Sequence, residues 1–178
     1  MRYHNITKDD MLNGDGLRTV LWVSGCSHCC KDCQNPITWD PNGGLAFDDK
    51  AKQELFAELS KDYISGVTLS GGDPLYFGNR SDILKLVKEI RELFPCKTIW
   101  MYTGDVWENV RGDSIMRYVD VLVDGEFQVD KKDAQLLWKG SSNQRVIDVQ
   151  RSLALPQGAE PVLHCGDYSE GWVKGWKQ

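Results

Sequence analysis

The sequence predicts an α/β protein with a mainly parallel sheet, and three observations support that fold class. Short apolar segments rich in β-branched residues alternate with longer segments of helical periodicity. Each of the first four apolar segments ends in a loop of glycine, small polar or cysteine residues. The chain has 178 residues, 41% of them hydrophobic, which is enough for one domain with a real core. Strands that alternate with helices favour parallel pairing.

The individual elements follow from this alternation. The expected strands are 18–24, 66–70, 97–102 and 119–123, with 145–149 as a fifth and 161–164 as an extended piece. Amphipathic helices are expected over 48–61, with Asp48 or Asp49 near the N-cap, and over 81–94, ahead of Pro95. Short helical turns are expected at 105–110 and 113–118. Periodicity is weak after residue 150, so we divide the chain into a domain, 1–150, and a C-terminal extension of unknown role, 151–178.

Composition excludes several classes of protein. The net charge is −5 and the sequence has no lysine/arginine run, which argues against nucleic-acid binding. No apolar segment approaches the ~20 residues of a membrane-spanning helix, and the first ten residues are too polar for a signal peptide. Four of the six cysteines crowd into one loop, which favours a metal or cluster site over disulfides and a reducing cytoplasm as compartment. The cysteines are Cys26, Cys29, Cys30, Cys33, Cys96 and Cys165.

The cysteine loop carries most of the functional information. Cys26, Cys30 and Cys33 form a C-x3-C-x2-C pattern, and three thiolates suit three corners of an iron–sulfur cubane. The fourth iron then has no protein ligand and stays open for a small molecule. The spacing alone also permits a zinc knuckle with His28 or Cys29 as fourth ligand.

Cys29 creates an ambiguity of register, because Cys26, Cys29 and Cys33 also form a compact trio. Adjacent thiols rarely bind one metal together since their side chains point apart, so we expect Cys29 to be a bystander. We expect Cys96 and Cys165 to be packed or surface thiols.

A second loop of interest, Ser70 to Pro74, follows the 66–70 strand. Gly71 and Gly72 allow positive φ and close approach of the backbone to a ligand, while Asp73 offers either a hydrogen-bond acceptor or a helix N-cap. Thr103 and Asp124 follow the next two strands. In parallel α/β folds the ligand site lies at the carboxyl ends of the strands, so these loops should share one face.

Together, the cysteine loop and the SGGDP loop resemble the radical S-adenosylmethionine superfamily. Within it, the chain resembles the activating components of anaerobic (class III) ribonucleotide reductases over roughly residues 1–150. Two positions depart from the expected pattern: Asp32 stands where many superfamily members have an aromatic residue, and Asp15 stands where proline is expected. The matching segments are 13–18, 23–26, 34–39, 68–75, 99–104, 120–127 and 137–145.

This resemblance implies a compact, incomplete radical-SAM (β/α) barrel with one open side. It implies that Cys26, Cys30 and Cys33 hold a 4Fe-4S cluster, whose open iron chelates the amino and carboxylate groups of S-adenosylmethionine. An external one-electron reductant would drive formation of a 5′-deoxyadenosyl radical, which would take a hydrogen from a glycine on the large subunit of the reductase and leave a glycyl radical. The protein's task is to position these groups and exclude water.

The resemblance also implies roles for individual side chains toward S-adenosylmethionine. Asp73 would accept hydrogen bonds from the methionine amino group, the backbone at 32–34 would line the adenosyl group, and Asp124 is either a ribose contact or a turn aspartate. The cofactor-binding residues expected on these grounds are Asp32, Cys33, Gln34, Gly71, Gly72, Asp73, Thr103 and Asp124.

Three other functions stay open at this point. One is a radical-SAM enzyme acting on a small molecule, similar to the deazaguanine-forming synthase; another is activation of a different glycyl-radical enzyme; a third is a non-enzymatic zinc-binding adaptor.

Segment 140–145 is either a polar turn or part of a cofactor or partner edge. We expect core positions for Trp39, Trp100 and Trp138, docking of Trp172 and Trp176 on the domain or a partner, and no general base among His4, His28 and His164.

Overall fold

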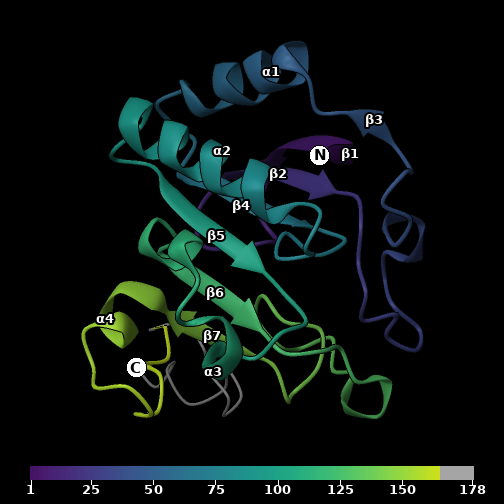
Figure 1. The fold of residues 1–178 in the computed structure, drawn as a ribbon, viewed down its shortest axis with the longest axis vertical. Coiled ribbons are helices and arrows are strands. Elements are labelled where there is room, and N and C mark those ends of the chain that lie inside the picture. The colour runs from purple at the N-terminus through teal and green to yellow at the C-terminus, as the bar shows by residue number, and fades with distance from the viewer. Residues whose placement is uncertain (165–178) are drawn as a thin grey trace, which may run out of the picture.

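The computed structural model describes residues 1–164 (Figure 1). Cys165, Trp172 and Trp176 lie outside the described residues, as does the second half of the predicted extension, 165–178. The boundary at residue 150 therefore stays a prediction.

A seven-stranded sheet in the order β3-β1-β2-β4-β5-β6-β7 forms the centre of the molecule. The four central strands β2, β4, β5 and β6 run parallel, whereas β1, β3 and β7 are antiparallel to their neighbours. Figure 1 shows the parallel arrows of β5 and β6 side by side. The strands are β1 Arg2–Asp10, β2 Arg18–Val23, β3 Leu45–Ala46, β4 Gly66–Gly71, β5 Thr98–Tyr102, β6 Val121–Asp124 and β7 Arg145–Asp148.

The α-helices are α1 Asp49–Leu59, α2 Arg80–Leu93, α3 Trp107–Val110 and α4 Val149–Leu153, with short 3-10 helices at Pro36–Thr38, Ser114–Arg117 and Val129–Lys131. Asp48 caps α1, because its carboxylate accepts a hydrogen bond from the Ala51 N–H. The apolar stripe of α2 is buried, and the helix ends before Pro95 as predicted. The buried sides of α1 and α2 pack with Leu21, Leu69 and Met101 of the sheet in one core.

Alternation along the strands separates two apolar clusters. Ile99 and Met101 of β5 belong to the main core under the helices, while Trp100 packs on the opposite face with Val121, Val123 and Val146. Trp138, from the connection between β6 and β7, covers this second face.

These observations confirm the α/β class and the parallel centre of the sheet, but they do not confirm a barrel. The sheet is open, with β3 and β7 at its edges. After β6 the chain returns through 125–144 as the antiparallel strand β7, which ends the parallel series within residues 1–164. The sequence did not predict β1, whose only buried apolar side chains are Tyr3 and Ile6.

The described part of the extension packs against the sheet edge. The Asp148 N–H donates to the Val162 carbonyl, and the His164 N–H donates to the Val146 carbonyl. Ile147 and Leu163 form an antiparallel bridge, so the predicted extended piece at 161–164 lies along β7.

Candidate functional site

A cavity of about 470 Å³ lies at the carboxyl ends of the parallel strands, among the loops that the sequence singles out. Each loop follows one strand: the cysteine loop follows β2, the SGGDP loop β4, residues 103–105 β5, and residues 125–127 β6. The predicted residues that line the cavity are Cys26, Cys30, Cys33, Gln34, Gly71, Gly72 and Thr103; Asp32, Asp73 and Asp124 do not line it.

The structure separates the three motif cysteines from Cys29. Cys26, Cys30 and Cys33 are half-buried and face the shared cavity. Cys29 is exposed, has a positive φ of 50° and is not part of the cavity lining. This geometry favours the register Cys26, Cys30, Cys33 as the ligand set.

Burial raises the pKa of both the Cys26 and the Cys30 thiol. Backbone N–H groups oppose this effect: those of His28 and Cys29 at the Cys26 sulfur, and that of Phe127 at the Cys30 sulfur. The two thiols are therefore protonated near neutral pH, and a metal that binds there must release their protons.

A single metal ion and a cluster require different spacings of their ligands. In a tetrahedral zinc site with Zn–S bonds of ~2.3 Å, the sulfurs lie about 3.8 Å apart. Among residues 1–164, His28, Asp73 and Asp105 are the one trio whose ligand atoms all lie within 4.8 Å of one another. Cys26, Cys30 and Cys33 all line one cavity, and three thiolates placed around a shared space suit a multinuclear group.

The two glycines of the SGGDP loop serve different purposes. Gly71 ends β4 with a φ of 104°, a conformation that other residues rarely adopt. Gly72 lies so close to the cysteine loop that a Cβ there would be 2.5 Å from the Gly25 carbonyl oxygen. Both positions bring bare backbone to the cavity wall.

The carboxylate of Asp73 lies behind the cavity wall, and the residue is only 2% exposed. Its Oδ1 accepts a hydrogen bond from the Leu75 N–H at 2.7 Å. Its Oδ2 accepts from Thr103 Oγ1 at 3.0 Å and from the Gly104 N–H at 3.2 Å. Asp73 thus links two strand-end loops, and its contact with a methionine amino group stays a prediction.

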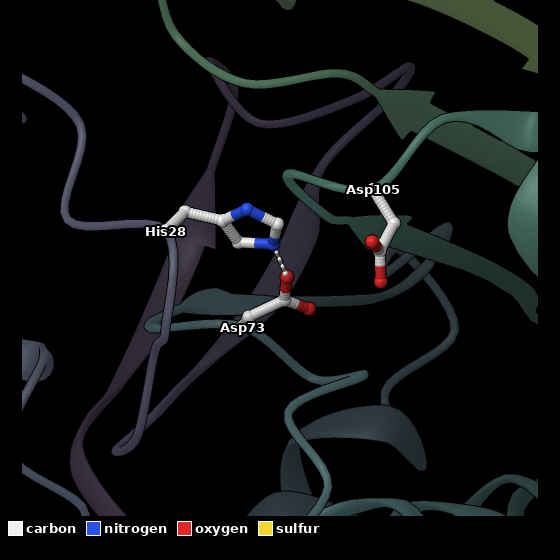
Figure 2. A group of neighbouring side chains, drawn as sticks. All are labelled: His28, Asp73 and Asp105. Carbon is white, nitrogen blue, oxygen red and sulfur yellow. Dashed lines mark hydrogen bonds and ion pairs between the residues drawn. The ribbon is translucent and has the colours of Figure 1, made fainter.

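His28 makes a pairing that the sequence did not predict (Figure 2). Its Nε2 lies 2.9 Å from Asp73 Oδ2, and its Nδ1 lies 2.8 Å from Glu126 Oε1. Since both partners are carboxylates, both ring nitrogens donate and the ring is cationic. The hydrogen bond to Asp73 is the main reason that the pKa of His28 rises to about 9, with burial opposing it and Glu126 adding to it.

Asp105 completes the carboxylate environment of His28. Figure 2 shows its side chain across from the His28–Asp73 pair. Arg80 lies 3.7 Å from its carboxylate, so two cations, His28 and Arg80, offset the acidic side chains here. With both nitrogens engaged, His28 is a poor candidate for the fourth ligand of a zinc knuckle.

Asp124 is engaged elsewhere. Its Oδ2 accepts a hydrogen bond from the Trp107 N–H at 2.7 Å, and both of its oxygens contact Arg145. Asp124 is 1% exposed, so it has no free face toward a ribose. The structure favours a turn aspartate, and the ribose contact stays an untested prediction.

Aromatic side chains from other positions form much of the cavity wall, although position 32 is Asp32 and not the expected aromatic residue. Asp32 is exposed, with a φ of 56°. Trp100 is buried as predicted, but Trp39 and Trp138 are only partly buried and face the cavity. The aromatic lining consists of Trp22, Trp39, Tyr102, Phe127 and Trp138.

Segment 140–145 combines the two alternatives that the sequence left open. Gln144 organises it as a turn: its Oε1 accepts from the N–H groups of Gly140 and Ser141, and its Nε2 donates to the Gly125 carbonyl. Gly140 and Gln144 also line the cavity, so this turn forms one of its edges.

Comparison with known proteins places these features in a family. Residues 12–147 match the family model described as a 4Fe-4S single cluster domain. The chain is 43% identical to a protein of Enterobacteria phage T4 over 146 residues, which cover 82% of this chain and 93% of that protein. It is 43% identical to an Escherichia coli K12 protein over 150 residues, covering 82% and 97%. It is 39% identical to a Pasteurella multocida protein over 150 residues, covering 81% and 95%. Each of these three is named anaerobic ribonucleoside-triphosphate reductase-activating protein.

In residues 1–164, no helix combines the length and the apolar character needed to cross a membrane.

Proposed function

The chain belongs to the family of anaerobic ribonucleoside-triphosphate reductase-activating proteins, and on that basis we propose that it is a radical-SAM activase that installs a glycyl radical on such a reductase. Its cofactors would be a 4Fe-4S cluster and S-adenosylmethionine. The free thiols fit a reducing compartment, and we keep the cytoplasm as the proposed location.

The observation that carries the proposal is the composition of one cavity wall. Cys26, Cys30 and Cys33 face the same cavity as the bare backbone of Gly71 and Gly72. Three thiolates suit three corners of a cubane, and the glycines leave room for a small molecule beside it. The cavity volume of about 470 Å³ falls in the range of small-molecule sites.

Cys26, Cys30 and Cys33 would hold the cluster, which would supply the one electron needed for reductive cleavage of S-adenosylmethionine and so for hydrogen abstraction from a glycine of the reductase. The chain's own residues position and shield these groups. Trp39, Phe127 and Trp138 give the cavity apolar walls that exclude water and offer flat faces for the adenine. Thr103 and Gly104 form its floor above Asp73.

The mouth of the cavity suits a macromolecular substrate. Leu12 lines the cavity and is 80% exposed, and the neighbouring Met11 is 73% exposed. Large apolar side chains at an open rim are typical of protein contacts. We propose that this rim meets the loop of the reductase that bears the target glycine.

Formation of 5′-deoxyadenosine tests the proposal. The protein is reconstituted anaerobically with iron and sulfide and reduced in the presence of S-adenosylmethionine, and the products are separated by chromatography. The proposal predicts equal amounts of 5′-deoxyadenosine and methionine. A colourless protein that retains zinc and makes neither product would contradict it and favour the zinc-binding adaptor.

A further inference from the structure

One side chain joins the cysteine loop to the ends of three other strands. Between Cys26 and Cys33, within the part of the chain that the structure describes, His28 is the one non-cysteine residue whose side chain hydrogen bonds another loop. Its ring reaches Asp73 in the loop after β4 and Glu126 in the loop after β6. Figure 2 shows the ring pointing at Asp73 from the cysteine loop.

Asp73 extends this linkage to a further strand. The oxygen that contacts His28, Oδ2, also accepts hydrogen bonds from Thr103 Oγ1 and from the Gly104 N–H, both after β5. The loops after β2, β4, β5 and β6 are therefore connected through the His28 ring and two carboxylates. Because Asp73 is almost fully buried, these bonds are protected from competition with water.

Packing fixes the ring as well. A Cβ at Gly104 would lie 2.5 Å from His28 Cδ2, so the imidazole lies directly against the backbone at that position. Contacts on one side and hydrogen bonds at both nitrogens leave the ring a single orientation.

The cysteine loop needs such support because its backbone is unfavourable on its own. Cys29 and Asp32 have φ values of 50° and 56°, in the left-handed region that non-glycine residues seldom adopt. Conformations of this kind persist only where the surroundings hold them in place. A loop that adopts them before the metal binds loses less conformational freedom when it binds.

We propose that His28 is a positioning residue: through Asp73 and Glu126 it fastens the cysteine loop to the strand ends and holds Cys26, Cys30 and Cys33 in a ligand-ready arrangement before a cluster binds. This inference rests on the proposed function for the identity of the group that the thiols would bind, a 4Fe-4S cluster. The hydrogen bonds of His28 that hold the cysteine loop are present in the metal-free chain, so their effect can be tested without a cluster.

Hydrogen exchange of the metal-free protein, followed by mass spectrometry, measures the fastening directly. In His28→Phe, which keeps a ring but has no nitrogens, amides 26–34 should exchange about tenfold faster than in the wild-type protein. His28→Gln, whose amide N–H can still donate to Asp73, should exchange more slowly than His28→Phe. The matched control Ser27→Ala changes an exposed neighbour that has no such bond and should behave like wild type. Rates in His28→Phe within about twofold of wild type would overturn the proposal.

A second variant, Glu126→Gln, keeps the proposal testable if His28→Phe destabilises the whole protein. The Glu126 side chain is 55% exposed, so its replacement leaves the core intact. It should raise exchange about threefold in amides 26–34 and nowhere in α1 or α2. If those amides keep the wild-type rate in Glu126→Gln, and His28→Phe raises exchange equally across the whole chain, His28 acts on stability alone and the proposal fails.

Iron retention provides a second readout. After anaerobic reconstitution, a ferrous chelator should remove iron about fivefold or more faster from His28→Phe than from Ser27→Ala, because outer contacts of metal ligands slow their release. Equal rates would contradict the positioning role. A wild-type protein that takes up no iron would overturn the proposed function, while the exchange experiment would still decide the role of His28.

Discussion

The carboxyl and amino ends of the parallel strands carry cavities of nearly equal size, about 470 Å³ and about 460 Å³. At the carboxyl end, thiols and bare glycine backbone face the space. Within residues 1–164, the amino-end cavity contains no cysteine in its lining, which includes Asp15, Asp120, Asp148, Arg151, His164 and Trp100. Size alone does not distinguish the two, whereas the ligand chemistry of their walls does.

The two ends also differ in how far their buried polar groups are satisfied by internal hydrogen bonds. At the amino end the fully buried Arg18 donates to the carbonyls of Val67 and Thr98 and lies 5.2 Å from the ring centroid of Trp100. Burial lowers its pKa to about 10, yet backbone and hydroxyl oxygens satisfy its donors. At the amino end the donors of Arg18 are thus satisfied by internal hydrogen bonds, whereas at the carboxyl end the thiols of Cys26, Cys30 and Cys33 face open space. Substitutions at the two ends should accordingly separate loss of stability from loss of function.

The largest effect should come from Cys30→Ala, which removes one thiol from the cavity. We expect at least about a 100-fold loss of 5′-deoxyadenosine formation, with an unfolding midpoint close to wild type because the side chain is only half-buried. The matched control is Cys29→Ala, which changes the exposed neighbour and should retain activity within about twofold. The reverse pattern would move the ligand set to Cys26, Cys29 and Cys33.

At the amino end, Arg18→Met should act on stability. The substitution removes a guanidinium that donates five hydrogen bonds and leaves buried carbonyl oxygens without their donor. We expect a loss of about 3 kcal/mol in the free energy of unfolding, measured by urea denaturation of the metal-free protein. Activity per bound cluster should stay within about threefold. A large loss of activity in a stably folded Arg18→Met protein would break the contrast between the two ends.

An intermediate effect is expected at the carboxyl end from Gly71→Ala. A Cβ at Gly71 would meet the backbone nitrogen and oxygen of Val23 at 2.7 Å, in addition to the strain of a positive φ. We expect a loss of about 2 kcal/mol, measured by urea denaturation. Gly158→Ala is the matched control, since Gly158 also has a positive φ but a Cβ there would meet no atom within 4 Å, and it should lose only about 1 kcal/mol. Equal losses would show that the close approach to β2 is unimportant.

The smallest effect should come from Glu108→Gln at the surface. The hydrogen bond from Arg145 lowers the pKa of Glu108, so the pair adds stability above the unfolded pKa of about 4.3 and loses it as the pH falls through the folded value. Because the Glu108 side chain is 54% exposed, the contribution at pH 7 should be below about 1 kcal/mol. Urea denaturation at pH 7 and pH 3 should show a smaller difference from wild type at the lower pH. A difference of the same size at both pH values would exclude the ion pair as its cause.

The order of elements could be predicted from the sequence where local pattern determines structure. The strands β2, β4, β5 and β6 are short apolar segments, and the helices α1 and α2 carry apolar residues at helical spacing. β1 was missed because most of its nine residues are polar and it pairs with β2 and β3 through its backbone. The antiparallel direction of β7 depends on the path of the 125–144 connection, which has no periodic signal.

Part of the site could also be predicted, because local sequence spacing determines it. Chain spacing places Cys26, Cys30 and Cys33 in one loop, and the rule for parallel strands brings that loop next to Gly71 and Gly72. The pairing of His28 was missed because its partners, Asp73 and Glu126, lie 45 and 98 residues away in the chain. Only the fold brings these three side chains together.

The central claim is tested most directly by electron paramagnetic resonance of the reductase after activation. The reconstituted protein is reduced and mixed anaerobically with S-adenosylmethionine and the large subunit of an anaerobic ribonucleotide reductase. We predict a glycyl-radical signal on the reductase that is absent with Cys30→Ala and absent when the reductase carries alanine in place of its radical glycine. Formation of 5′-deoxyadenosine without any radical on the reductase would contradict the claim and assign the chemistry to another substrate.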